Sequence, residues 1–265
     1  MMNNLRTLGR FLFALSMTAF GIQYFLYGKF LGGLPLVPPW MPGGPWAAYL
    51  TGAVLIALSI GMVTRRRASS SATLLGILFL LSVLFLHGLR GAEILSNGVT
   101  RTRAFEALGL GSAALLMAGA LPGERLASQH WSTIQSKLAQ LGRFLFALSL
   151  AVFGAQHFQF ASFVATLVPS WIPGHLFWTY FTGIAMLAAA VAIAANRYAS
   201  LAAIWMGIMF LLWVLLLHAP RVATQPRKGD EWTSAFVALA MCGSSFAAAG
   251  ALGHNRNAWL LRHSS

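Results

Sequence analysis

The sequence predicts an all-α, polytopic membrane protein whose eight transmembrane helices form two parallel-repeat four-helix bundles. Of its 265 residues, 58% are apolar and only 9% are charged, whereas a soluble domain carries roughly 25% charged residues. Long apolar stretches lack the alternation of a β-strand, and the second half of the chain repeats the first. A single cysteine, Cys242, excludes internal disulfides, CxxC redox pairs and metal clusters held by several thiolates.

Eight segments approach the roughly 20 apolar residues that cross about 30 Å of hydrocarbon. The Lys and Arg residues fall in the short loops between these segments rather than within the segments. We expect the spans at residues 11–27, 46–63, 72–89, 104–121, 144–160, 176–195, 201–217 and 234–252.

The eight segments form two sets of four. Residues 8–21 read LGRFLFALSMTAFG and residues 141–154 read LGRFLFALSLAVFG, so eleven of fourteen positions are identical. Collinear matches continue to His87 and His218, and the second copy is slightly shorter in its first outer loop. This predicts an internal duplication. Its parts are a first repeat at 1–121, a polar cytoplasmic linker with a short amphipathic helix at 122–140, and a second repeat at 141–265.

An even number of spans per repeat predicts two parallel copies related by a pseudo-two-fold axis along the membrane normal. Alternate loops hold eleven Lys and Arg on one side and seven on the other. The excess predicts a multi-pass protein of the inner (cytoplasmic) membrane with both termini in the cytoplasm. The formal charge is +13. We assign it to topology and to contacts with membrane lipids, not to nucleic acid, because no basic face is interleaved with aromatic residues.

Polar side chains within the spans mark a candidate binding site, because each one costs free energy in hydrocarbon. In each repeat they lie at a similar depth, near the outer surface. The candidate ligand-binding residues are Gln23, Tyr24, His87 and Arg90, with Gln156, His157, His218 and Arg221 in the second repeat. A structural role stays open for each, since Gln and His also form interhelical hydrogen bonds and arginines snorkel to headgroups. Arg103 and Glu106, three apart on one helix face, are expected to form an ion pair.

Two loops between the first and second span of each repeat contain no charged residue. They occupy positions 31–45 and 162–175 and carry Trp40 and Trp171 among prolines and glycines. Tryptophan prefers the membrane interface, so we expect these loops to lie on the outer leaflet. They act either as aromatic anchors or as a lid over the polar cluster.

The chain resembles the DoxX-like family of small four-helix membrane proteins (DoxX/DoxD type), here in tandem. The first repeat carries the resemblance in residues 20–30, in residues 52–62 with the following arginines at 65–67, and in His87. The second carries it in residues 153–158, residues 183–186 and His218. The resemblance implies a subunit of a membrane oxidoreductase system, because members of this family include part of a thiosulfate:quinone oxidoreductase.

The leading functional hypothesis is an integral membrane oxidoreductase subunit that binds a quinone or similar lipid in the outer leaflet. His87 and His218 would bond a quinone carbonyl, Gln23 and Gln156 would position it, and a partner membrane or redox protein would supply electrons. Haem b between the two histidines is a minority alternative, and no metal site is expected without carboxylates or thiols at ligand spacing. A non-catalytic scaffold or assembly factor is the main alternative, and a small-solute transporter is the third. No Gly-rich phosphate loop, Ser-His-Asp order or carboxylate pair indicates a soluble-type enzyme.

Overall fold

The computed structural model describes residues 1–30, 44–64, 67–88, 91–121 and 129–263, and of residues 129 and 254–263 it describes the backbone only. Every element in this part of the chain is helical. The elements are α1 (Met2–Tyr27), α2 (Pro45–Val63), α3 (Ala68–Ser82), η1 (Val83–His87), α4 (Gly91–Ser96), α5 (Gly98–Ala120), α6 (Gln129–Gln159), α7 (Ala161–Ala165), α8 (His175–Ala194), α9 (Ala199–Trp213), η3 (Val214–His218), α10 (Ala219–Thr224) and α11 (Gly229–His263).

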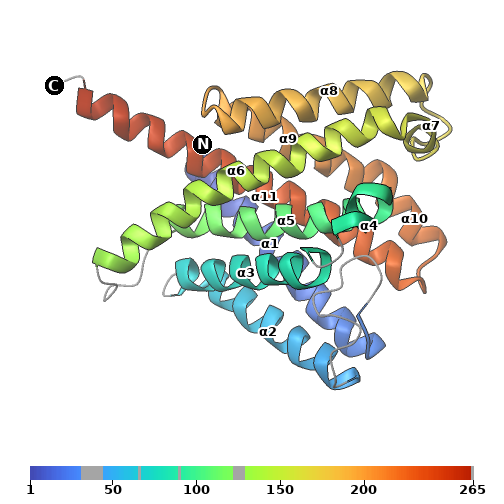
Figure 1. Cartoon of the computed structure of the whole chain (residues 1–265), viewed down its shortest axis with the longest axis horizontal. Coiled ribbons are helices and arrows are strands. Elements are labelled where there is room, and N and C mark those ends of the chain that lie inside the picture. Colours follow the sequence, from blue (N-terminus) through green and yellow to red (C-terminus); the bar gives the residue numbers. More distant parts are fainter. Residues whose placement is uncertain (31–43, 65–66, 89–90, 122–128, 264–265) are drawn as a thin grey trace.

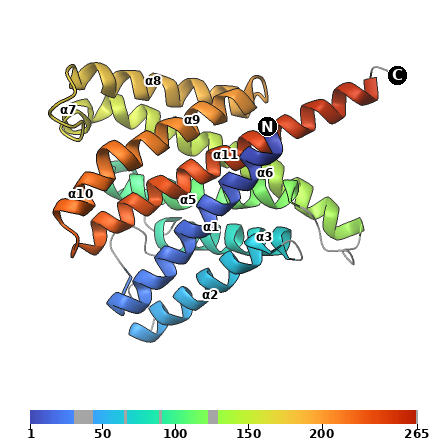
Figure 2. The same ribbon diagram turned by 180° about the vertical axis from the view of Figure 1, so that it is seen from behind.

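All eight predicted apolar segments coincide with helices, apart from a terminal residue or two, so the all-helical class is confirmed. Most of the helices are longer than their apolar cores. In particular, α6 begins at Gln129, so residues 129–140 of the expected linker continue directly into the first helix of the second repeat. Three short helices, α4, α7 and α10, lie towards one end of the molecule, and both termini lie towards the other (Figures 1 and 2).

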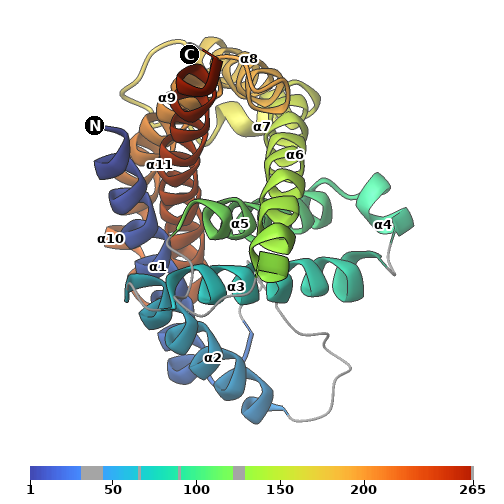
Figure 3. The ribbon, with the colours of Figure 1, turned by 90° about the vertical axis from the view of Figure 1, so that its left-hand side faces the viewer.

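The long helices pack in an order that runs around the molecule. Within the first set α1 packs on α2, α2 on α3 and α3 on α5, and within the second set α6 packs on α8, α8 on α9 and α9 on α11. The first helix of each set also packs extensively on the last helix of the other set, α1 on α11 and α6 on α5. Seen end-on, α2 and α8 lie at opposite edges, with α5 and α11 between them (Figure 3). The two sets therefore interlock.

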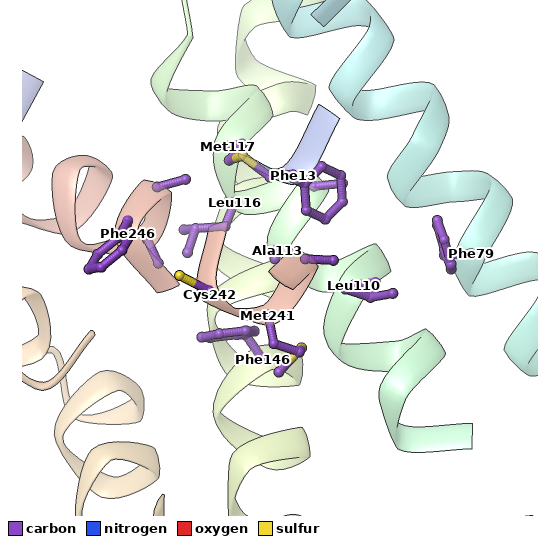
Figure 4. Packing of buried hydrophobic residues seen from close by; sticks show 14 of the residues in the cluster. Phe13, Phe79, Leu110, Ala113, Leu116, Met117, Phe146, Met241, Cys242 and Phe246 are labelled. Atoms are coloured by element: carbon purple, nitrogen blue, oxygen red, sulfur yellow. The ribbon is translucent and has the colours of Figure 1, made fainter. Parts of the chain in front are cut away.

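The centre of the fold is formed by α5 and α11, which contact each other. Every residue of α5 from 109 to 118 is buried, as is nearly every residue of α11 from 240 to 252. Phe13 of α1 and Phe146 of α6, equivalent positions of the two sets, are both fully buried against this pair (Figure 4). A helix surrounded by protein on all sides is typical of the interior of a bundle.

Seven of the helices are long and apolar enough to cross a membrane, which supports a membrane protein with transmembrane helices. They are Met2–Tyr27, Pro45–Val63, Ala68–His87, His130–Gln159, His175–Ala194, Ala199–Thr224 and Gly229–Gly253. The long helix outside this set is α5, which carries Arg101, Arg103 and Glu106 near its start and is rich in Gly, Ala and Ser further on. Its low hydropathy fits its central position, because close helix packing in membranes uses small residues.

Glycines allow the two interlocking contacts to form at short range. A Cβ on Gly9 of α1 would collide with the backbone of Gly243 and Ala247 in α11. A Cβ on Gly142 of α6 would collide in the same way with the backbone of Ser112 and Leu116 in α5. Gly142 aligns with Gly9 in the duplication, and the α11 pair aligns with the α5 pair. The same close crossing is therefore made twice by equivalent residues.

Candidate functional site

Gln23 and Gln156 each bond the first turn of a helix in the other set. The Nε2 atom of Gln156, on α6, donates to the carbonyl of Gly98 at 3.1 Å and to Thr102 Oγ1 at 3.0 Å, both on α5. The Nε2 atom of Gln23, on α1, donates to the carbonyl of Gly229 on α11 at 3.2 Å. Thr233 Oγ1 donates back to Gln23 Oε1 at 3.4 Å. We call these two arrangements the Gln clasps.

The Gln clasps are built from equivalent residues. Gly229 and Thr233 occupy the positions in the second repeat that Gly98 and Thr102 occupy in the first. Both threonines also donate to the glycine carbonyl one turn earlier, at 2.9 Å and 3.0 Å. Both glutamine side chains are buried. These amides therefore hold the two sets together, rather than pointing at the histidine of their own set.

His87 and His218 occupy matching and unusual backbone positions. Each ends a π-helical turn, Val83–His87 and Val214–His218, inserted at the end of the third long helix of its set. Single π-helical turns inside α-helices occur frequently at functional sites. His87 is buried and His218 is partly buried. Within the described residues, the Nδ1 atom of His218 is shielded from solvent and has no hydrogen-bond partner.

Aromatic side chains pack together just before the second of these turns. The ring of His157, on α6, stacks on Trp213 with centroids 5.8 Å apart and an interplanar angle of 25°. Trp213 immediately precedes the π-helical turn that ends at His218, and Phe210 packs edge-on against it at 5.4 Å. His157 Nδ1 lies 2.7 Å from the carbonyl of Phe153 and must carry the proton to bond it. Neutral His157 therefore keeps an acceptor lone pair on Nε2.

The equivalent positions of the first set carry different chemistry. Tyr24 stands where the second set has His157, and Ser82 stands where it has Trp213. Tyr24 is buried and packs edge-on against Phe30 at 5.0 Å. Ser82 donates to the carbonyl of Phe79 on its own helix. The stack of His157 on Trp213 is thus specific to the second set. Together with His218, five residues after Trp213 in the sequence, we call it the second-repeat cluster.

The remaining candidates are Arg221, three residues after His218, and residues that are exposed or outside the described part of the chain. Arg221 is partly buried on α10. Trp171 is 69% exposed, so it packs little against the rest of the chain. Arg90 and Trp40 lie outside the described residues. Arg103 and Glu106 both lie in the early turns of α5, and the ion pair expected between them stays a prediction.

In the part of the chain that the structure describes, no three His, Cys, Asp or Glu side chains gather as they would around a metal ion. His157 lies against the ring of Trp213.

Sequence reasoning missed Trp213 and the two threonines of the Gln clasps. The threonines had a detectable signal, because Gly98 and Thr102 recur as Gly229 and Thr233 in the duplication. No sequence signal distinguishes the π-helical turns, since VLFLH and VLLLH are ordinary apolar segments ending in histidine.

The fold and the site together define a helical integral membrane protein with a histidine–aromatic cluster in its second set of helices. A domain family of unknown function (DUF8561) matches residues 146–241, from the middle of α6 to the middle of α11. The matched segment contains the second-repeat cluster. No curated protein and no solved structure matches the chain.

Proposed function

We propose that the chain is an integral membrane subunit of an oxidoreductase system that binds a quinone or similar ring-bearing lipid at the second-repeat cluster. The observation that carries the proposal is the shielded Nδ1 atom of His218, which ends a π-helical turn without a hydrogen-bond partner in the described residues. A polar atom left unpaired in hydrocarbon costs free energy. A quinone carbonyl that accepts a bond from Nδ1–H, once the side chains covering this atom have moved aside, removes this cost.

The surroundings of His218 support a flat aromatic ligand. The stacked rings of His157 and Trp213 offer a π-face close to His218 along α9 and η3, and offset stacking with a quinone ring extends that arrangement. The Gln clasps engage both amides within the chain, so Gln23 and Gln156 maintain the helix arrangement instead of positioning the ligand. Electrons come from a partner membrane or redox protein, as the DoxX-like resemblance implies.

The architecture that we propose for this function has eight membrane-spanning helices, namely the seven long apolar helices and α5. Support comes from the central burial of α5, from the Gln clasps, and from the glycine crossings that recur in the duplication. The two repeats are then parallel and related by a pseudo-two-fold axis along the membrane normal. The excess of Lys and Arg at the end with both termini supports a cytoplasmic location for that end, in the inner membrane.

Binding of decylubiquinone to the purified full-length chain tests the function. Saturable quenching of tryptophan fluorescence is expected, and its saturable part disappears in Trp213→Phe. His218→Ala should weaken binding about tenfold, because it removes one hydrogen bond and leaves its partner unsatisfied. His130→Ala, at an exposed histidine near the start of α6, is the matched control. Equal affinity for decylubiquinone in His218→Ala and His130→Ala would contradict a quinone site at His218.

A non-catalytic scaffold is the second candidate, and the Gln clasps favour it, because they consume polar groups for assembly of the fold itself. If the chain is a scaffold, His218→Ala lowers recovery of a membrane partner in affinity purification. Quinone then associates with the protein no more than it does with bulk lipid. The two functions therefore differ in which measurement responds to the same substitution.

A further inference from the structure

A cavity of about 410 Å³ opens at the end of the molecule that carries both termini, opposite the second-repeat cluster. It lies where the last turn of α5, the early part of α6 and α11 meet the turn between α8 and α9. Leu116 and Leu252 give it an apolar wall, and Gln140, Arg143 and Asn196 give it a polar one. Its volume falls in the range of roughly 300–1,000 Å³ that is typical of small-ligand pockets.

The two repeats differ at one position beside this cavity. Ala139, which lines it, aligns with Arg6 of the first repeat. Arg6 extends its guanidinium, and Nη1 donates to the carbonyl of Ala120 at 2.8 Å. Ala120 also lines the cavity. Ala139 fills less of this space than an arginine would, and the bond to Ala120 brings the positive charge of Arg6 to a residue of the cavity wall.

The charge of this cavity is one-sided. The guanidinium of Arg143 lies over the ring of Phe144, 4.6 Å from its centroid, a cation–π contact that limits its freedom. No Asp or Glu lines the cavity within the described residues. The described carboxylates are on α4 and in the early turns of α5 and α11, towards the opposite end of the molecule: Glu93, Glu106, Asp230 and Glu231. Among the described residues, an anion therefore meets arginine there without a competing carboxylate.

We propose that this cavity binds the phosphate headgroup of an anionic phospholipid. Arg143 binds the phosphate. Gln140 and Asn196 form hydrogen bonds with the hydroxyls of the headgroup, and the acyl chains lie against Leu116 and Leu252. Basic pockets between membrane helices on the cytoplasmic side are suited to such headgroups. The site is separate from the proposed quinone site and stands without it.

Native mass spectrometry of the purified full-length chain, titrated with phosphatidylglycerol or phosphatidylcholine, tests the proposal. We expect one phosphatidylglycerol to bind about tenfold more tightly than phosphatidylcholine. Arg143→Gln should reduce that preference about tenfold, since a charge-assisted bond to phosphate is lost. Ser136→Phe, at an exposed lining position, should block the cavity without disturbing the core. Lys137→Gln removes an exposed charge from the same helix and should change the preference less than twofold.

Two results would overturn the proposal. The first is an unchanged preference in both Arg143→Gln and Ser136→Phe, which moves lipid selectivity elsewhere on the surface. The second is complete displacement of phosphatidylglycerol by excess inorganic phosphate, which identifies a site for a soluble anion instead of a lipid. Retention of the lipid in phosphate, together with its loss in Ser136→Phe, supports the proposal even if Arg143→Gln fails to fold.

Discussion

Replacing Gln156 by leucine removes one of the two Gln clasps while keeping the side chain about the same size. The Gln156 amide nitrogen donates to two acceptors on α5, and the Gln23 amide nitrogen donates to one carbonyl on α11. Interhelical hydrogen bonds in membrane proteins average about 0.6 kcal/mol and reach about 1.7 kcal/mol. We therefore expect Gln156→Leu to lower the free energy of unfolding by about 1–1.7 kcal/mol, and Gln23→Leu by about 0.6 kcal/mol.

The assay is reversible unfolding of the full-length chain in mixed detergent micelles, followed by circular dichroism. A double-mutant cycle with Thr102→Val isolates the contact, because the threonine hydroxyl bonds the glutamine amide directly. The coupling energy should be about 0.5 kcal/mol or more, as is usual for residues in one hydrogen-bond network. Gln140→Leu, the same substitution at an exposed position of the same helix, is the control and should leave the free energy of unfolding nearly unchanged.

Additivity in that cycle would refute the reasoning, because it means that the two side chains do not interact in the folded protein. A second outcome would also contradict the reasoning: Gln156→Leu is as stable as the unsubstituted chain but does not bind decylubiquinone. Gln156 would then be a ligand-binding residue, as the sequence analysis predicts.

Three further predictions concern packing and topology. Gly9→Ala places a Cβ against the backbone of α11 and should cost about 1–3 kcal/mol of unfolding free energy, whereas Gly91→Ala, which meets nothing within 4 Å, should be neutral. Alkaline phosphatase fused after Gly229 should be active and fused at the C-terminus inactive, and the reverse pattern would invert the orientation. Cys242 is fully buried and should react with maleimide in membranes only after denaturation; rapid labelling of the native protein would contradict its central position.

Composition and hydropathy were sufficient to predict the helical class and the positions of all eight long helices. Their partners were not predictable in the same way. Two arrangements are possible: each repeat closes its own four-helix bundle, or the first helix of each repeat packs on the last helix of the other. Both arrangements bury Phe13 and Phe146, and both bring α3 onto α5 and α9 onto α11. The sequence periodicity of α1 is the same whether it packs on α5 or on α11, so hydropathy alone cannot separate the two arrangements.

The candidate site was predictable in part. The histidines stood out because they are polar residues in apolar segments, but the two glutamines stood out for the same reason and proved to be bonded within the chain. The π-helical turns depend on backbone hydrogen bonds that an ordinary apolar sequence does not reveal. The importance of Trp213 follows from its contact with His157, which comes from a different helix much earlier in the chain.

The interlocking of the two repeats is the central claim, and disulfide trapping tests it most directly. In a Cys242→Ala background, Leu12→Cys should crosslink with Gly243→Cys, because a Cβ at Gly243 lies 3.0 Å from the Cβ of Leu12. The same Cβ comes within 2.7 Å of backbone atoms of Gly9 and Phe13, so a small shift of α1 accompanies the crosslink. Ser112 is the equivalent of Gly243 within the first repeat, so Leu12→Cys with Ser112→Cys is the matched pair. Mass spectrometry of non-reduced peptides should find the first crosslink and little of the second. The opposite result would mean that each repeat closes its own four-helix bundle.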